Sequence, residues 1–343
     1  MAKNKAITIG GVEVKPGTRA SINVPIADLY TGTSLSMPVK VFCGKSAGPV
    51  LFVSAAVHGD ELNGVEVIRR LQIQKALRSV RGTLITVPVV NVHGFLNQSR
   101  YLPDRRDLNR SFPGSAKGSI ASRTAHTFLN EIVKKAEYGI DLHTGAINRS
   151  NLPQIRANLD DAKTEELARV FGAPVILNAS IRDGSLRSCA ADRGFPMLVY
   201  EAGEALRFDE MSIRAGLRGV LKVMRHLGML PSSKSAKRSI VPMIAASTSW
   251  VRAPESGIVS RKVKLGTRVV KSEQLAVVGD PLGDFQEKVV APFDGIVIGR
   301  SNLPLAHEGD ALFNIAAFKS VARAETRVEE FAAIHGEAED QSS

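Results

Sequence analysis

The sequence predicts an α/β fold, in which a sheet is covered by helices, followed by a smaller all-β region. Three observations predict it. Apolar runs alternate with helical patterns through residues 45–230. A polar segment, PSSKSAKRS, then interrupts the pattern at 231–239. Short strands and turns occupy residues 240–318.

The alternation allows each element of residues 45–230 to be assigned in order. Residues 1–44 come first and are β-rich, with SINVPIADLY and MPVKVFCG as strands packed on the α/β domain. The predicted strands that follow are PVLFVSAAV, TLITVPVV, YGIDLH, APVILN and FPMLVYEAG. The predicted helices between and after them are ELNGVEVIRRLQIQKAL, IASRTAHTFLNEIVKKA, AKTEELARVF and FDEMSIRAGLRGVLKVMRHLG.

Residues 231–239 read as a linker, and the region after them contains a weak repeat in which AP-x-x-G-I-V occurs twice. These half-motifs resemble the barrel-sandwich hybrid of biotinyl and lipoyl carrier domains. The position that would hold the modified lysine falls near Asp284, so neither biotin nor lipoate is predicted. Residues 319–343 read as a tail that begins as a short helix and ends polar and acidic.

Composition limits the classes of function. With 343 residues and 44% hydrophobic content, the chain is long enough for two domains. It has no apolar run of about 18 residues and no apolar stretch at its start, which predicts a cytoplasmic protein without a membrane span. The two cysteines, Cys43 and Cys189, are far apart, so a metal site would use histidine and carboxylate ligands.

The formal charge of +11 fits nucleic acid, an anionic substrate or a soluble basic surface. Lysine and arginine are dispersed along the chain, and only 5% of residues are aromatic. Both observations argue against a nucleic-acid partner.

VSAAVHGDELNG brings His58 to the end of a predicted strand, with Glu61 three residues later at the start of a helix. Ligands of open α/β sheets bind at that edge. A catalytic zinc needs three nitrogen or oxygen ligands, which requires another histidine. Of the seven histidines, His93 and His143 both follow strands. Asp141, two residues before His143, is placed to support a ligand from behind.

RYLPDRRDLNRSFPG, residues 100–114, contains four arginines in a segment too polar for a core. Arginine forks bind carboxylates and stabilise oxyanions. Beside a zinc site, this segment is a candidate substrate-binding loop.

The motifs HGDE, RDLNRSFPG, DLHTG and VYEAGE together resemble the succinylglutamate desuccinylase/aspartoacylase family over residues 45–230. The resemblance implies a zinc-carboxypeptidase-like mixed sheet flanked by helices. It also implies one Zn²⁺ per chain, bound by His58, Glu61 and His143, which leaves His93 with a structural or supporting role.

The same resemblance assigns substrate contacts. Asn109 and Arg110, from DLNR, would hold the substrate carboxylate, and Arg187 would bind a further acidic group. Arg100 resembles the arginine that polarises the scissile carbonyl, with Arg106 as its rival because the spacing to DLNR is longer than in aspartoacylase.

Glu201 would then be the general base and acid, with Glu204 as the neighbour that could take its place. We therefore predict zinc-dependent hydrolysis of the amide bond of a small anionic N-acyl amino acid. The alternatives are a zinc carboxypeptidase that trims peptides and a non-catalytic binding protein. A C-terminal region packed over the cleft would favour small amides, whereas one swung away would leave room for peptides. This region is also a candidate surface for a homo-oligomer.

Overall fold

The computed structural model describes residues 2–179, 183–232 and 240–336. Its first 204 residues contribute strands β1 (Ile7–Ile9), β2 (Val12–Val14), β3 (Arg19–Asp28), β4 (Ser34–Cys43), β5 (Val50–Ala55), β6 (Thr83–Val87), β7 (Tyr138–Gly145), β8 (Arg149–Ala157), β9 (Val175–Asn178) and β10 (Met197–Glu204). The later strands are β11 (Met243–Ala245), β12 (Ser247–Arg252), β13 (Gly257–Ser260), β14 (Arg268–Val269), β15 (Gln274–Gly279), β16 (Gln286–Val290), β17 (Gly295–Ser301), β18 (Leu305–Ala306) and β19 (Ala311–Ala317).

The α-helices are α1 (Asn63–Gln72), α2 (Val92–Leu96), α3 (Ile120–Glu131), α4 (Ala162–Phe171), α5 (Leu186–Asp192), α6 (Glu210–His226) and α7 (Val321–Gly336). Short 3-10 turns are η1 (Lys75–Ser79), η2 (Leu108–Arg110) and η3 (Val133–Lys135). Among the described residues, no helix is long and apolar enough to cross a membrane.

The main sheet is mixed, and its strand order is β12-β19-β17-β8-β10-β7-β5-β6-β4-β3. Strands β10, β7, β5 and β6 run parallel, whereas β3, β4, β8 and β17 pair antiparallel with their neighbours in this order. Outside this order, β8 also pairs in parallel with β9. The carboxyl ends of β5, β7 and β10 therefore meet at one edge of the sheet, where ligands of α/β proteins bind.

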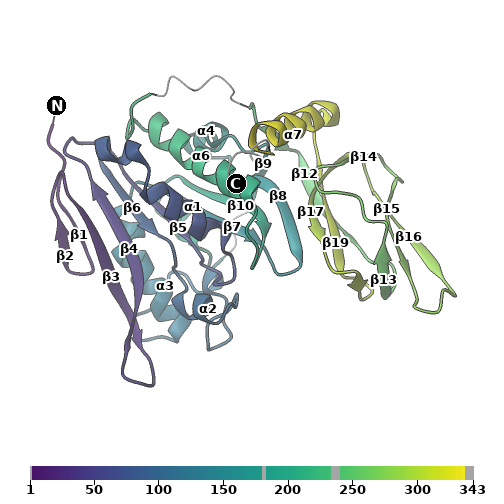
Figure 1. Cartoon of the computed structure of the whole chain (residues 1–343), viewed down its shortest axis with the longest axis horizontal. Coiled ribbons are helices and arrows are strands. Elements are labelled where there is room, and N and C mark those ends of the chain that lie inside the picture. Colours follow the sequence, from purple (N-terminus) through teal and green to yellow (C-terminus); the bar gives the residue numbers. More distant parts are fainter. Residues whose placement is uncertain (1, 180–182, 233–239, 337–343) are drawn as a thin grey trace, which may run out of the picture.

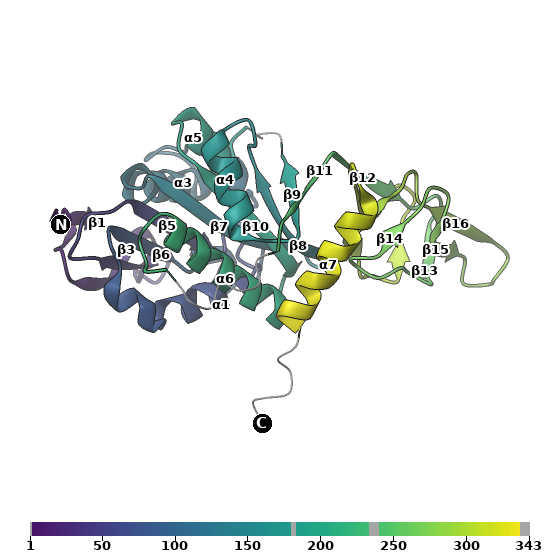
Figure 2. The ribbon, with the colours of Figure 1, turned by 90° about the horizontal axis from the view of Figure 1, so that it is seen from above.

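Helices cover both faces of this sheet (Figures 1 and 2). One face packs against α1, α4 and α6, through side chains such as Val67, Phe171 and Val220. The other packs against α3 and α5, through Phe128 and Leu186. The predicted α/β fold, with helices flanking a mixed sheet, is confirmed.

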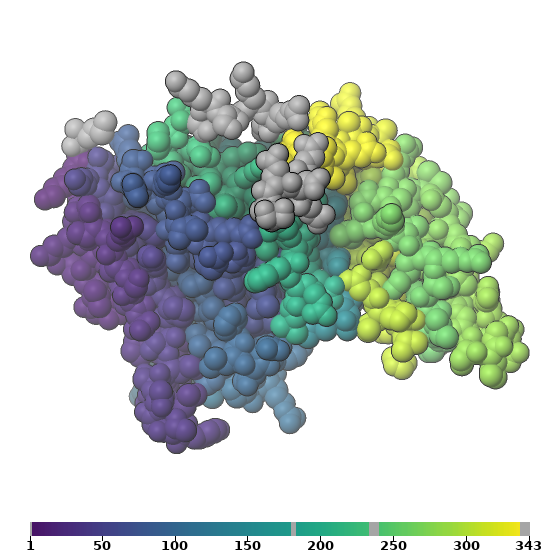
Figure 3. All heavy atoms as spheres, in the orientation of Figure 1, coloured from purple at the N-terminus to yellow at the C-terminus, as the bar shows by residue number. Residues whose placement is uncertain are grey.

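The C-terminal region adds a separate antiparallel sheet of order β16-β15-β13-β18, as the all-β prediction required. Figure 3 shows this region and the first 50 residues at opposite ends of the molecule. It is also joined to the main sheet, because β17 pairs with β8. The domain boundaries near residues 230 and 240 stay predictions, and residues 233–239 of the predicted linker lie outside the described residues.

Candidate active site

The loop after β5 places the first two candidate ligands. The chain leaves the strand through Ala56, which adopts the left-handed conformation (φ 48°). Gly59 then passes so close to the next loop that a Cβ there would lie 2.0 Å from the carbonyl carbon of Gly94. This tight turn carries His58 and Glu61 inward, and both are buried.

The third candidate ligand comes from the neighbouring strand. His143 lies near the carboxyl end of β7 and is buried. Its partner in register on parallel strand β10 is Glu201. Asn63, at the start of α1, joins the loop that carries His58 and Glu61 to strand β10. Its side chain donates to the Ala202 carbonyl oxygen at 3.1 Å and accepts from the Asp209 amide at 3.0 Å.

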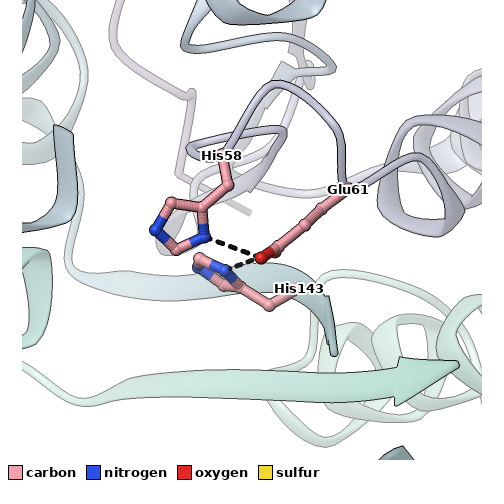
Figure 4. Close-up of side chains that lie close together, drawn as sticks. All are labelled: His58, Glu61 and His143. Carbon is pink, nitrogen blue, oxygen red and sulfur yellow. Dashed lines mark hydrogen bonds and ion pairs between the residues drawn. The ribbon is translucent and has the colours of Figure 1, made fainter. Parts of the chain in front are cut away.

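The three side chains converge on one point, as Figure 4 shows. His58 Nδ1 lies 2.7 Å from Glu61 Oε1, and His143 Nδ1 lies 2.8 Å from Glu61 Oε2. One ligand atom from each residue lies within 4.8 Å of the others. Two imidazole nitrogens and a carboxylate oxygen suit a divalent metal such as zinc, and with three protein ligands a fourth position is left for water or substrate.

The outer ring nitrogens are held by carboxylates. His58 Nε2 lies 3.1 Å from Asp107 Oδ1, and His143 Nε2 lies 2.6 Å from Asp141 Oδ2. These contacts orient both rings with Nδ1 toward the shared point, which is the usual role of such partners around a metal. The role of Asp141 follows the prediction, whereas sequence reasoning missed Asp107.

The carboxylate and the two imidazoles of the cluster shift one another's pKa values. Burial by itself raises the pKa of Glu61, but His58 and His143 outweigh it and hold that pKa below its ordinary value. Burial lowers the pKa of His143, but Asp141 and Glu61 outweigh it and raise that pKa well above the ordinary value. A metal that binds these imidazole nitrogens would therefore compete with protons for them.

A cavity of about 490 Å³ opens beside the cluster. Its lining includes the predicted site residues His58, Glu61, Arg100, Asn109, Arg110, His143, Arg187 and Glu201. Among the described residues, Arg106 and Glu204 do not line it. His93 also lies outside the lining, and its buried Nε2 has no hydrogen-bond partner in the described part of the chain.

The two rival arginines point to different places. Arg100 Nη1 lies 3.4 Å from Glu61 Oε1, and its Nη2 donates to Asp107 Oδ2 at 3.0 Å. The side chain of Arg106 is 65% exposed and lies beside Asp104. Arg100 is therefore the arginine placed next to the metal cluster.

The two rival glutamates also separate. Glu201 faces the cavity, where Asn151 Nδ2 donates to its Oε2 at 2.9 Å and Arg156 Nη1 lies 3.5 Å from both carboxylate oxygens. Glu204 instead accepts from the Asn148 amide at 2.9 Å and from Asn302 Nδ2 at 2.7 Å. Glu204 therefore joins β10 to the C-terminal region.

The residues predicted to bind substrate carboxylates, Asn109, Arg110 and Arg187, line the cavity. Asn109 Oδ1 accepts from the Leu186 amide at 3.0 Å, at the start of α5. Arg110 donates to the Asn109 carbonyl oxygen, and Arg187 Nη1 donates to the Ala179 carbonyl oxygen at 3.0 Å. These contacts bring the arginine-rich loop and α5 together at the cavity wall.

The C-terminal region completes the cavity. Residues 245–248, Trp250 and Asn314 line it. They come from β11, β12 and β19, or from the turn between β11 and β12, and sequence reasoning did not assign them to the site. Their only signal was their position in the C-terminal region, for which the sequence left open whether it covers the cleft or lies away from it.

Comparison with known proteins places this geometry in a family. The sequence pattern of the succinylglutamate desuccinylase/aspartoacylase catalytic domain matches residues 47–227, more than half of the chain. The chain belongs to this family. This succinylglutamate desuccinylase/aspartoacylase protein is 26% identical over 308 residues to the N-alpha-acetyl-L-2,4-diaminobutyric acid deacetylase of Halomonas elongata, an alignment that covers 86% of this chain and 90% of the relative.

Solved structures share the fold over nearly the whole length. A succinylglutamate desuccinylase/aspartoacylase of Rhodobacter sphaeroides is 25% identical, with a TM-score of 0.78 over 88% of this chain and 96% of that chain. The product-bound ectoine utilization protein EutE of Ruegeria pomeroyi is 24% identical, with a TM-score of 0.79 over 88% and 95%. Family, fold and buried metal-binding cluster agree, so the chain is a deacylase of the succinylglutamate desuccinylase/aspartoacylase type, as predicted.

Proposed function

We propose that this protein is a zinc-dependent hydrolase of small N-acyl amino acids. The observation that carries the proposal is that the buried His58, Glu61 and His143 share a cavity wall with Glu201, directly beside His143 in register. A metal cluster and a separate carboxylate at one wall are the two parts that metal-assisted amide hydrolysis needs.

His58 Nδ1, Glu61 and His143 Nδ1 would hold the ion, with Asp107 and Asp141 fixing the rings. Zinc held there supplies Lewis acidity, which polarises a carbonyl and lowers the pKa of water. Zinc suits this donor set, although other divalent ions bind similar ligands.

Glu201 takes the proton of the water that adds to the amide carbonyl carbon. It then delivers that proton to the nitrogen as the C–N bond breaks, releasing the acyl carboxylate and the free amino acid. The amide of Asn151 and the guanidinium of Arg156 orient the Glu201 carboxylate.

The Arg100 guanidinium, whose Nη1 lies 3.4 Å from Glu61 Oε1, would donate to the developing oxyanion. Asn109 and Arg110 would bind the α-carboxylate of the substrate, and Arg187 a further acidic group.

The cavity favours small amides over peptides. Its volume of about 490 Å³ lies within the range of small-molecule sites, and β12 with its preceding turn closes one side. A carboxypeptidase would need space for a chain extending past that wall. The two free cysteines are buried, which fits the reducing cytoplasm where we place the enzyme.

The experiment is a substrate panel. The zinc-loaded protein is incubated with N-acetyl and N-succinyl amino acids, N-alpha-acetyl-2,4-diaminobutyrate and short peptides, and amine release is measured. Turnover of N-acyl amino acids is expected. Release of C-terminal residues from peptides, without N-acyl amino acid turnover, would make the chain a carboxypeptidase.

A further inference from the structure

A short turn connects the metal cluster to the proposed general base. Residues 146–148 join β7 to β8. The candidate ligand His143 lies on the β7 side of this turn. Asn151 lies on the β8 side, and its Nδ2 donates to Glu201 Oε2 at 2.9 Å. The path of the turn therefore helps to set where the carboxylate of Glu201 stands relative to the metal cluster.

The turn is held by partners outside itself. Asn148 adopts the left-handed conformation (φ 60°), which residues with a Cβ rarely take up unless their neighbours hold it. Its amide donates to Glu204 Oε1 at 2.9 Å, and its carbonyl oxygen accepts from the Asn302 amide at 2.7 Å. Both peptide groups of this residue are thus held from opposite sides.

Glu204 and Asn302 also bond to each other. Asn302 Nδ2 donates to Glu204 Oε2 at 2.7 Å and to Ser150 Oγ at 2.7 Å. Glu204 comes from β10, whereas Asn302 comes from the C-terminal region, between β17 and β18. We call the three residues Asn148, Glu204 and Asn302 the turn clamp. The clamp joins the two regions of the chain beside the cavity.

Cations of the C-terminal region fix Asn302. Arg300 Nε and Nη2 donate to Asn302 Oδ1 at 3.3 and 3.2 Å, which assigns the amide nitrogen to the side of Glu204. Lys262 Nζ donates to the carbonyl oxygens of residues 301–303 at 3.2, 3.0 and 2.6 Å. One ammonium with three carbonyl partners holds this segment in a single conformation, so Asn302 presents its amide to the clamp in a fixed direction.

The clamp lies next to an irregular part of β10. The register of β10 with β7 and with β8 shifts after Glu201. Such a shift redirects side chains and interrupts regular pairing, so the strand alone does not fix the direction of Glu201. Glu204 anchors the chain immediately after the shift, through its bonds to Asn148 and Asn302.

We propose that Asn302 and Glu204 are positioning residues of the deacylase. By holding Asn148, they fix the turn between β7 and β8 and orient the carboxylate of Glu201 toward the metal cluster. The C-terminal region then contributes to turnover through this clamp, as well as through the cavity wall. This inference rests on the deacylase function proposed above. Within the described ranges, neither Asn302 nor Glu204 lines the cavity, so both act on turnover rather than on substrate binding.

An exchange of the two partners tests the clamp. In Asn302→Asp, the new carboxylate faces that of Glu204. In Glu204→Gln, the new amide faces that of Asn302, so each single substitution replaces an attraction by a repulsion. The double variant, Glu204→Gln with Asn302→Asp, restores a hydrogen bond of reversed direction. It also keeps an acceptor for Arg300 and leaves the net charge unchanged.

Turnover is measured on the best N-acyl amino acid of the substrate panel. Each single variant should lose about tenfold in kcat, because a general base displaced from its productive geometry costs turnover. KM should stay within about threefold, since neither side chain lines the cavity in the described part of the chain. The double variant should recover kcat to within about threefold of the wild type, as coupled partners do.

Trp250 gives a readout that needs no turnover. It is the one tryptophan of the sequence, and its ring centre lies 4.5 Å from the guanidinium of Arg149, the residue after Asn148. A displaced turn withdraws this guanidinium and lets water reach the ring. The fluorescence emission of Trp250 should therefore shift to longer wavelength in both single variants and return in the double variant.

Lys262→Met keeps the test available where a charge change in the clamp prevents folding. It removes the three contacts to the carbonyl oxygens of residues 301–303 without placing like groups together. We expect kcat to fall severalfold with KM unchanged, because the segment that presents Asn302 becomes less ordered. A kcat equal to that of the wild type would contradict the positioning role.

Glu325→Gln is the matched control. Glu325 on α7 pairs with Arg268 Nη1 at 3.3 Å in the same C-terminal region, and it is not part of the clamp. Its kcat and its Trp250 emission should equal those of the wild type. Wild-type kcat in Asn302→Asp, or a double variant no faster than the single variants, would overturn the proposal while leaving the deacylase intact.

A zinc-loaded wild type that hydrolyses no N-acyl amino acid would instead overturn the deacylase function, and with it the role of the clamp in turnover. The emission of Trp250 separates the two failures, because it reports the turn whether or not the protein is a deacylase. Emission that is unchanged in both single variants would show that Asn302 and Glu204 do not hold the turn.

Discussion

His58 and His143 present the same ring nitrogen, Nδ1, to the shared point because a carboxylate holds each Nε2 from behind. An imidazole held this way has one tautomer and one orientation, so less ordering remains when a metal binds. Asp107 also accepts from Arg100 and from the Asn109 amide. One carboxylate therefore connects a candidate metal ligand, the arginine proposed to face the oxyanion and the proposed substrate-binding loop.

Metal content tests this arrangement. His58→Ala and His143→Ala should lose most bound zinc, whereas Asp107→Asn should keep it with an affinity about 10- to 100-fold weaker. Zinc per chain is measured after dialysis, and affinity by competition with a chelator. His93→Ala is the control, because His93 lies outside the cavity lining. Stoichiometric, tightly bound zinc in both histidine variants would contradict the ligand assignment.

Glu201→Gln tests the general base. Glutamine keeps the size of the side chain but accepts no proton, so kcat should fall by roughly two orders of magnitude or more. Zinc content should be unchanged, because Glu201 is not one of the three ligands. Glu204→Gln serves as the comparison on the same strand. A larger loss of kcat in Glu204→Gln than in Glu201→Gln would transfer the role to Glu204.

At the scale of elements, helix α7 packs back on α6. The ring of His335 lies 4.4 Å from that of Phe331, and its Nδ1 lies 3.4 Å from Arg218 Nη1. Burial, with Arg218, Lys222 and Arg214 nearby, lowers the pKa of His335 to about 4. A helix in the predicted tail therefore carries a histidine that must stay neutral.

This lowered pKa predicts an acid sensitivity. The unfolded chain protonates His335 more readily than the folded chain does. The stability that neutral His335 contributes is therefore fully present above pH 6.5 and is lost as the pH falls from there toward about 4. The melting temperature of the wild type should fall over this range more than that of His335→Leu. Parallel pH profiles of the two proteins would show that His335 does not contribute.

At the scale of the whole molecule, the main sheet and the C-terminal region share a core. Leu152 of β8 and Val175 of β9 cluster with Ile296 and Ile298 of β17 and with Phe318. Glu204 and Ser150 meet Asn302 across the same junction. The cavity wall formed by Trp250 and Asn314 depends on this shared sheet.

Truncation should therefore destabilise the remaining domain. A fragment of residues 1–232 would expose the edge of β8 and uncover Leu152, conditions that favour aggregation. We expect it to lack a cooperative thermal transition, as followed by circular dichroism and light scattering beside the full chain. A monomeric fragment that melts cooperatively with full zinc would show that the two regions are independent. The predicted homo-oligomer stays a prediction, which the same light scattering of the full chain checks.

The local part of this site was predictable from sequence. His58 and His143 follow apolar strands whose carboxyl ends meet at one edge, and Glu61 lies three residues after His58. His93 follows a strand too, so it was the family resemblance that selected His143. Arg100 and Arg106 were not separable from sequence, since the turns of the five loop residues between them determine where each side chain points. Asp107 was missed because its partner, His58, is 49 residues away in the chain.

The sequence alone determined the fold class and the family resemblance, because hydrophobic period and short motifs are local properties of the chain, and that resemblance in turn predicted the ligand set. Only the tertiary structure decided that β17 extends the main sheet at β8, and that Trp250 thereby reaches Arg149. The physical reason is register: pairing between strands about 150 residues apart depends on how their side chains and turns pack, which no local pattern contains.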